Sequence, residues 1–137
     1  MNGQPNPTLL LTGRTLMGLL FLLAGIRKIM YYAGTGGYFA HLGLPAVQIL
    51  LPLVILIEIG GSAMLITGWN AKYAALLLAA FTVLATAAGH QFWNADAANY
   101  GNQFNNFWKN VSIIGGLLYI AAFGPGPRAL RTKKSAG

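Results

Sequence analysis

The chain has 137 residues, of which 55% are hydrophobic and only 8% are charged. Soluble domains carry about 25% charged residues, so this composition excludes an ordinary water-soluble globular protein. The formal net charge is +7, but the basic residues lie at the ends of apolar segments and no recognition module contains them, which argues against nucleic acid as a partner. The sequence has no cysteine, so this chain alone cannot perform thiolate chemistry or bind an iron–sulfur cluster. Any redox role therefore needs a bound cofactor or a partner protein.

Long apolar blocks follow one another along the chain, and each approaches the ~20 residues that cross a bilayer core. They cover approximately residues 8–32, 46–68, 71–93 and 104–123. We do not interpret the first block as a secretory signal, because no basic residue precedes it and Arg14 interrupts it. The blocks predict an all-α integral membrane protein, in which a four-transmembrane-helix bundle in the lipid bilayer forms a single domain over residues 1–137.

The basic residues set the predicted orientation of this bundle. The tail, residues 124–137, contains a dense basic cluster made of Arg128, Arg131, Lys133 and Lys134. Such clusters stay in the cytoplasm, and four spans then place both termini there, together with Arg14 and Lys72. The remaining basic residues fall on the outer side, within the ends of apolar spans, and are Arg27, Lys28 and Lys109.

The two outer connections differ in composition. Residues 31–46 combine aromatic side chains with glycine, which predicts a short helix at the level of the lipid headgroups. Residues 94–106 are rich in asparagine and glutamine and predict a turn-rich segment that faces water.

A stripe of special residues runs along the first span. At 100° per residue its members fall within about 40° of one line, in the order Arg14, Gly18, Phe21, Gly25 and Lys28. The small residues let a neighbouring helix approach, and the charged ends lie about 21 Å apart at 1.5 Å per residue. We predict packing or structural roles for Arg14, Gly18, Phe21 and Gly25, and for Gly61 in the second span. The stripe is either a packing seam with snorkelling ends or part of a pocket.

Glu58 is the most informative single residue, because it lies near the middle of the second span. A charged side chain there costs several kcal/mol unless it is paired, hydrated or neutralised. Its candidate partners are Arg27, Lys28 and Lys109. Measured along each helix from its outer end, Glu58 lies about 18 Å deep and Lys28 about 6 Å deep, so contact needs long side chains, tilt or a distorted span. Pro52, which precedes Glu58, is a candidate for that distortion.

His90 lies near the outer end of the third span and suits a proton carrier, a haem ligand, a hydrogen-bond donor to a quinone carbonyl, or simply a polar interface residue. Lys109 and Asn110 begin the last span at a similar depth. We therefore predict an outward-facing polar pocket above Glu58, surrounded by Arg27, Lys28, His90, Lys109 and Asn110. No metal site is predicted, since His41, His90, Asp96 and Glu58 form only a weak metal signature.

Several short motifs, in this order and spacing, resemble the DoxX family of small four-helix membrane proteins. They are RTLMGLLFLLAGIRK at 14–28, HLGLP at 41–45, EIGGSAMLITG at 58–68, the His90 position and FGPGP at 123–127. The resemblance covers nearly the whole chain and implies a helical bundle in a prokaryotic cytoplasmic (inner) membrane. Family members often have an acidic residue shortly after the GPGP turn, whereas this chain has Arg128 there.

Some members of that family are linked to quinol oxidase or thiosulfate:quinone oxidoreductase complexes, others to oxidative-stress assemblies, and most have no defined activity. The leading hypothesis is a redox-associated subunit of a membrane oxidoreductase that binds a quinone or a similar amphipathic molecule. In it, Glu58 and His90 are catalytic groups that handle protons, and Arg27, Lys28, Lys109 and Asn110 bind the ligand. The alternatives are a noncatalytic membrane scaffold and, less favoured, a small transporter formed by a homo-oligomer.

Overall fold

The structure is a computed structural model that describes residues 3–130, so the predicted tail residues Arg131, Lys133 and Lys134 lie outside the described residues. Within residues 3–130 the chain forms helices joined by loops, and no strand occurs there. The elements in chain order are α1 (Pro7–Met30), α2 (Tyr32–His41), α3 (Val47–Thr67), α4 (Ala71–Gly89), the short 3-10 helix η1 (Phe92–Asn94) and α5 (Ala97–Phe123). The predicted all-α fold is confirmed.

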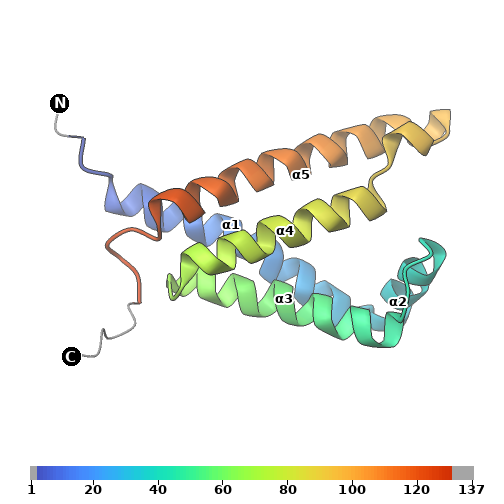
Figure 1. Cartoon of the computed structure of the whole chain (residues 1–137), viewed down its shortest axis with the longest axis horizontal. Helices are drawn as coiled ribbons and strands as arrows, with labels where there is room; N and C mark the ends of the chain where they lie inside the picture. Colours follow the sequence, from blue (N-terminus) through green and yellow to red (C-terminus); the bar gives the residue numbers. More distant parts are fainter. Residues whose placement is uncertain (1–2, 131–137) are drawn as a thin grey trace.

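The long helices form two pairs, α1 with α3 and α4 with α5, which make the most extensive contacts in the molecule. Figure 1 shows that the pairs meet where α1 begins, α5 ends and the turn between α3 and α4 lies. We call this region the closed end. Toward the opposite end, which carries α2 and η1, the ribbons of α3 and α4 diverge (Figure 1). We call that region the open end.

Within the part of the chain that the structure describes, three segments are long and apolar enough to cross a membrane: Pro7–Met30, Val47–Thr67 and Ala71–Asn94, the last of which combines α4 and η1. The fourth predicted span, in α5, is a long helix but does not join them. Its first half is rich in asparagine, and its apolar run from 111 to 123 covers only about 20 Å at 1.5 Å per residue. A hydrocarbon core is about 30 Å thick.

The predictions for the two connections expected on the outer side, at 31–46 and 94–106, have different outcomes. The short helix predicted within residues 31–46 exists as α2. The prediction of a turn-rich segment over 94–106 is wrong, because α5 begins at Ala97. The Asp96 side chain caps this helix by accepting a hydrogen bond from the Asn99 N–H at 3.0 Å. Aromatic rings at helical spacing then pack edge-on against Phe92 of η1, which fixes the start of α5, and they belong to Tyr100, Phe104 and Phe107.

The interior is built from small apolar residues near the closed end. Its buried core consists of Phe21, Leu65, Ala71, Ala74, Ala75, Leu78, Ala79 and Leu117. The alanines of α4 let its neighbours approach closely. In contrast, large apolar side chains such as Leu56, Leu84 and Phe123 point outward and are 68–77% exposed. Apolar exteriors with buried polar groups suit a helix bundle surrounded by lipid.

The stripe of α1 faces α3. Arg14, Gly18, Phe21 and Gly25 are the buried residues of α1. A Cβ atom added at Gly18 would lie 2.5 Å from Ile66 Cγ1, and one at Gly25 would lie 2.6 Å from Ile59 Cγ1. The absence of side chains at these glycines therefore brings α1 into direct contact with α3. Gly61 plays the same part between α3 and α4, since its Cβ would lie 2.9 Å from Leu78 Cγ.

Candidate functional site

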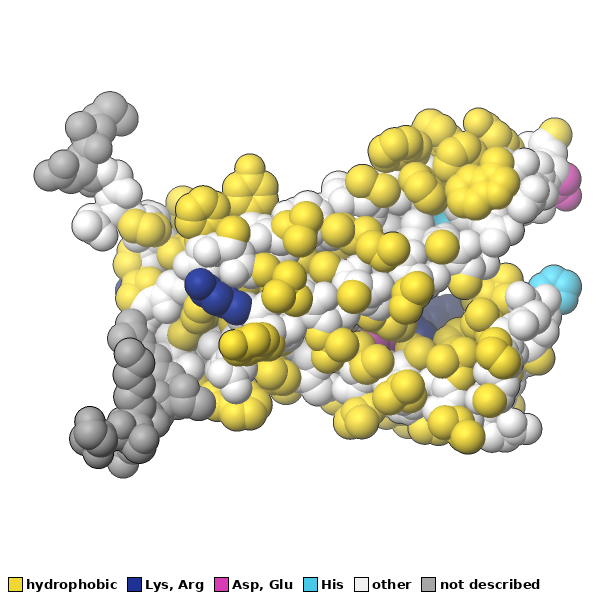
Figure 2. Space-filling model, in the orientation of Figure 1, with side chains coloured by type: hydrophobic (Ala, Val, Ile, Leu, Met, Phe, Trp, Pro, Cys, Tyr) yellow, Lys and Arg dark blue, Asp and Glu magenta, His cyan; other side chains and the backbone are white. Residues whose placement is uncertain are grey.

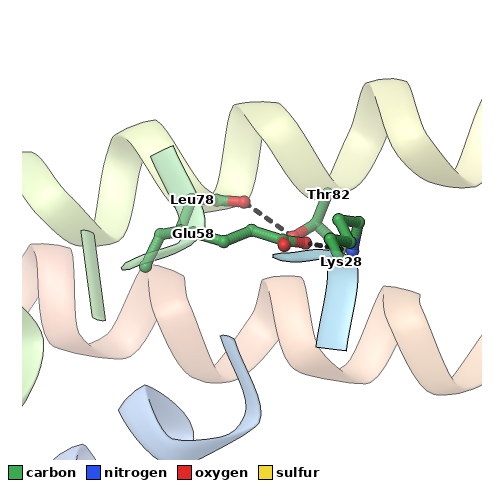
Figure 3. Close-up of polar contacts among 4 residues, drawn as sticks. All are labelled: Lys28, Glu58, Leu78 and Thr82. Carbon is green, nitrogen blue, oxygen red and sulfur yellow. Dashed lines mark hydrogen bonds and ion pairs between the residues drawn. The ribbon is translucent and has the colours of Figure 1, made fainter. Parts of the chain in front are cut away.

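The only ion pair among residues 3–130 joins α1 to α3 (Figure 3). The Lys28 Nζ lies 2.9 Å from the Glu58 Oε1 and donates a hydrogen bond to it. Glu58 is 3% exposed, whereas the Lys28 side chain keeps 22% of its surface accessible. The pair is therefore buried on its acidic side and reachable on its basic side.

Lys28 and Glu58 meet although their depths, counted from the helix ends, differ. The cause is the position of α3, whose first turns pack against α2: a Cβ at Gly36 would touch Val47 and Leu51. Gly25 lies beside Glu58, since its Cβ would come within 3.3 Å of the Glu58 Cβ. Lys28 follows three residues later, about 4.5 Å further along α1, a distance that a lysine side chain covers. No break in α3 is needed, and the helix runs continuously through Pro52.

Glu58 is not fully satisfied by this pairing. Its second oxygen, Oε2, is buried and has no hydrogen-bond partner among the described residues. Figure 3 shows the side chain of Thr82, from α4, directed toward this carboxylate, but the Thr82 hydroxyl donates to the Leu78 carbonyl at 2.6 Å. An unsatisfied buried oxygen costs about 1–3 kcal/mol, and more when it is charged, so a site that keeps one calls for a functional explanation.

The ion pair lies in the wall of a cavity of about 620 Å³ between the two helix pairs. Figure 2 shows this hollow near the open end, with acidic and basic side chains visible inside it. Its polar lining comprises Lys28, Glu58, Thr82, His90, Lys109 and Asn110. Most other lining residues are leucine, alanine, isoleucine and phenylalanine, so the cavity is more apolar than the predicted polar pocket. Its size and mixed lining suit a small amphipathic ligand.

One face of α4 carries a ladder of polar groups from the ion pair toward the open end. Thr82, Thr86 and His90 follow at intervals of four residues, and Thr86 donates to the Thr82 carbonyl at 2.6 Å. Asn110 of α5 donates to the Thr86 hydroxyl at 2.9 Å, and the His90 Nδ1 lies 2.8 Å from the Gln103 Oε1. Thr82 and His90 are about 12 Å apart along the helix, so Glu58 and His90 occupy different depths of the cavity.

The remaining predicted ligand-binding residues are placed differently. Lys109 lines the cavity, is itself exposed, and donates to the Asn106 side chain at 3.0 Å. Arg27 is exposed, does not line the cavity, and lies 5.5 Å from the ring centroid of Tyr31 as a cation–π pair. The structure thus brings Lys28, Glu58, His90, Lys109 and Asn110 to one cavity and leaves Arg27 outside it.

Sequence reasoning missed Thr82, Thr86 and Gln103. The four-residue spacing that leads from the two threonines to His90 is a signal that identifies a polar face on α4. Gln103 had no such signal, because the segment before 104 was predicted to lack helical structure.

The predicted structural residue Arg14 lies at the closed end, away from the cavity. The residue is 3% exposed, and its guanidinium donates to three backbone carbonyls: that of Ile66 in α3 at 3.2 Å, and those of Arg128 at 2.7 Å and Pro125 in the loop after α5. Arg14 thereby ties the loop after α5 to α1 and α3. The loop also donates from the Leu130 N–H to the Thr67 carbonyl at 2.9 Å. Because these contacts use the backbone at position 128, they do not require an acidic side chain there.

Comparison with known proteins finds relatives of this chain, two of which are named inner membrane proteins of a bacterium. It is 33% identical to "Inner membrane protein YphA" of Escherichia coli over 93% of this chain and 91% of that protein. It is 40% identical to "Inner membrane protein YqjF" of the same species over 85% of this chain and 84% of that protein. A third relative, "Surfeit locus protein 4 homolog" of Schizosaccharomyces pombe, is 31% identical over 60% of this chain and 28% of that protein.

No solved structure matches the chain. The family model named DoxX matches residues 9–91, a segment that contains the α1 stripe, Lys28, Glu58 and His90. With its apolar helices, this chain is a membrane protein that belongs to the DoxX family.

Proposed function

We propose that this protein is a redox-associated membrane subunit that binds a quinone, or a similar amphipathic molecule, in the cavity between its helix pairs. The single observation that carries the proposal is the Lys28–Glu58 ion pair, buried in the wall of a largely apolar cavity. Replacing a buried pair by apolar residues is often neutral or stabilising, so stability alone is a weak reason to keep one. Ionisable groups within apolar spans mark ligand sites and proton pathways.

The chemistry of the pair fits a ligand that carries an oxygen atom. An ammonium group has three donors, and one of those of Lys28 is used by Glu58, which leaves donors for a carbonyl oxygen in the cavity. The Glu58 Oε2, which lacks a partner among the described residues, can accept a proton from a hydroxyl of the bound molecule when that molecule is in its reduced, quinol form. In this proposal Lys28 orients the ligand oxygen and Glu58 handles protons beside it.

His90 has the second proton-handling role, at the other end of the polar ladder. Its Nδ1 is engaged by Gln103, which leaves Nε2 for the cavity or for water at the outer surface. Asn110 is held by Thr86 and Lys109 lies nearby, so both contact the ligand only toward the open end. The chain has no cysteine for redox chemistry of its own, so electrons for any redox step come from a bound cofactor or a partner protein.

The proposal includes four transmembrane spans with both termini in the cytoplasm. α5 packs along α4, and two of its polar residues, Gln103 and Asn110, are turned inward to His90 and Thr86. Polar groups that face the interior lower the apolar content of a span, but these groups are not exposed to lipid. The aromatic cluster around Phe92 then lies at the outer headgroup level, and the cavity belongs to the outer half of the membrane.

The experiment is quinone binding to the purified protein in lipid nanodiscs. We expect Glu58→Gln and Lys28→Met to weaken binding at least about tenfold, the equivalent of one lost interaction of about 1.4 kcal/mol. Lys72→Met is the matched control, because Lys72 is an exposed lysine at the closed end and its loss should leave affinity unchanged. Unchanged tight binding in Glu58→Gln and Lys28→Met would remove the pair from the site.

A noncatalytic scaffold is the second candidate function, and one observation favours it. Aromatic side chains of η1 and α5 form a cluster at the open end in which Trp93, Tyr100 and Trp108 are 47–55% exposed. Exposed aromatic clusters suit contacts with another subunit as well as with headgroups. Purification in mild detergent would then recover a stoichiometric partner, and Trp93→Ala with Trp108→Ala would release it.

A further inference from the structure

The wall of the cavity between α3 and α4 consists of side chains that also face the outside. Leu53 of α3 and Leu77 and Leu84 of α4 line the cavity, yet they are 48%, 46% and 70% exposed. A residue that is both lining and exposed lies at the rim of an opening. The cavity is therefore open on the side of the bundle, along the gap between α3 and α4, as Figure 2 shows.

This opening has a structural cause. Near the closed end, α3 and α4 are joined by a short turn and touch where Gly61 meets Leu78. Beyond that contact the two helices diverge toward the open end (Figure 1). The α4 residues there that line the cavity include Ala80, Ala85 and Ala88, whose short side chains do not close the gap.

The end of the cavity that faces the outer surface is covered instead. Tyr38, Phe39, Leu42 and Leu44, from α2 and the loop after it, line the cavity there. α2 reaches across to α4, since the Tyr38 hydroxyl lies 3.2 Å from the position of a Cβ at Gly89. α2 and its loop therefore form a largely apolar roof, and the lateral gap is a route to the ion pair that this roof does not cover.

We propose that the ligand reaches the Lys28–Glu58 pair sideways from the bilayer, through the lateral opening between α3 and α4. This inference rests on the proposed function and specifies the class of ligand: a membrane-dissolved molecule with a polar, oxygen-bearing head and an apolar tail. The head lies at the ion pair, and the tail remains between the leucines of the rim, where it replaces lipid chains. A water-soluble compound with the same head group but no apolar tail makes no contact with the leucines of the rim and therefore binds more weakly.

The test uses variants that narrow the opening and leave both residues of the ion pair unchanged. Ala80→Trp places a large side chain at the rim, whereas Ala87→Trp places the same side chain on an exposed position of α4 that does not line the cavity. The probes are a decyl-substituted benzoquinone and the same ring with a methyl group, measured in nanodiscs against their concentration in the bilayer. We expect Ala80→Trp to weaken binding of the decyl compound at least about tenfold, and that of the methyl compound less, because the indole ring occupies the space that the decyl chain needs.

A second pair of variants guards against misfolding at position 80. Leu84→Trp alters the rim, and Leu76→Trp alters an exposed leucine of α4 that does not line the cavity. Both rim variants should weaken binding of the decyl compound and both controls should not. Equal binding in rim and control variants overturns the lateral route but leaves the proposed function intact. If the wild-type protein binds neither quinone, the proposed function fails, and the lateral route fails with it.

Discussion

At the closed end the buried guanidinium of Arg14 is surrounded by backbone carbonyls, whereas at the open end the buried carboxylate of Glu58 faces one lysine and a cavity. The carbonyls that bind Arg14 come from α3 and the loop after α5, so this cation holds segments distant in sequence together. Only its Nε lacks a partner among the described residues. Among residues 3–130 no backbone N–H donates to the Glu58 carboxylate, whose one partner is Lys28, and a space of about 620 Å³ adjoins the carboxylate.

These different surroundings indicate two different roles for buried charges within one bundle. A charge surrounded by backbone dipoles in a packed region contributes to stability and leaves no room for a ligand. A charge with one partner beside an apolar cavity is poorly placed for stability but can recognise a polar head group. Substitutions at the two ends should therefore have different consequences for folding and for binding.

The largest expected effect is at the open end. Lys28→Met leaves Glu58 buried without its cation, and removing one partner of a buried pair lowers the free energy of unfolding by about 3–5 kcal/mol. The double variant Lys28→Met/Glu58→Leu removes both charges and should regain most of that stability while quinone binding stays lost. Denaturation in mixed micelles, followed by circular dichroism, measures the stability of each variant. A double variant as unstable as the single one would show that the pair is structural.

A slightly smaller effect is expected at the closed end, with the opposite result for binding. Arg14→Leu leaves the carbonyls of Ile66, Pro125 and Arg128 without their donor, which should lower the free energy of unfolding by about 3 kcal/mol. Arg128→Leu is the control, because its side chain is exposed and only its carbonyl is used, so we expect a change within about 0.5 kcal/mol. Folded Arg14→Leu protein should bind quinone like the wild type. Loss of binding without loss of stability would contradict the division between the two ends.

The sequence predicts much of this arrangement because its signals are local and periodic. Three apolar blocks have lengths that agree with α1, α3 and α4 to within a few residues. The α1 stripe predicts a face, and the face is the one that α3 contacts. A carboxylate is rare in the middle of an apolar span, so the sequence alone identifies Glu58 as a candidate site residue.

The sequence did not predict features that depend on where helices end in space. When depth is counted from the helix ends, Lys28 and Glu58 are placed far apart. That count does not include the packing of the first turns of α3 against α2, which sets the position of α3 beside α1. The polar composition of 97–106 hid a helix whose aromatic face packs on Phe92. The lateral opening likewise follows from the divergence of two helices, which no short motif encodes.

The smallest expected effect tests whether the α1–α3 seam holds the closed end tightly. In Gly18→Ala the new methyl group would lie 2.5 Å from Ile66 Cγ1 and 3.3 Å from the Ser62 carbonyl oxygen, so the two helices must shift or Ile66 must rearrange. Such overpacking should lower the free energy of unfolding by about 1–3 kcal/mol. Gly13→Ala is the matched control on the same helix, because nothing lies within 4 Å of its added Cβ.

The control should gain up to about 1 kcal/mol, since alanine is the better helix former. The same denaturation assay measures the change in the free energy of unfolding of each variant relative to the wild type. The signs of the two changes decide the result. A tight seam gives opposite signs for Gly18→Ala and Gly13→Ala. Equal gains in the free energy of unfolding would mean that α1 and α3 move apart freely. The closed end would then not be a rigid support from which α3 and α4 diverge around the cavity.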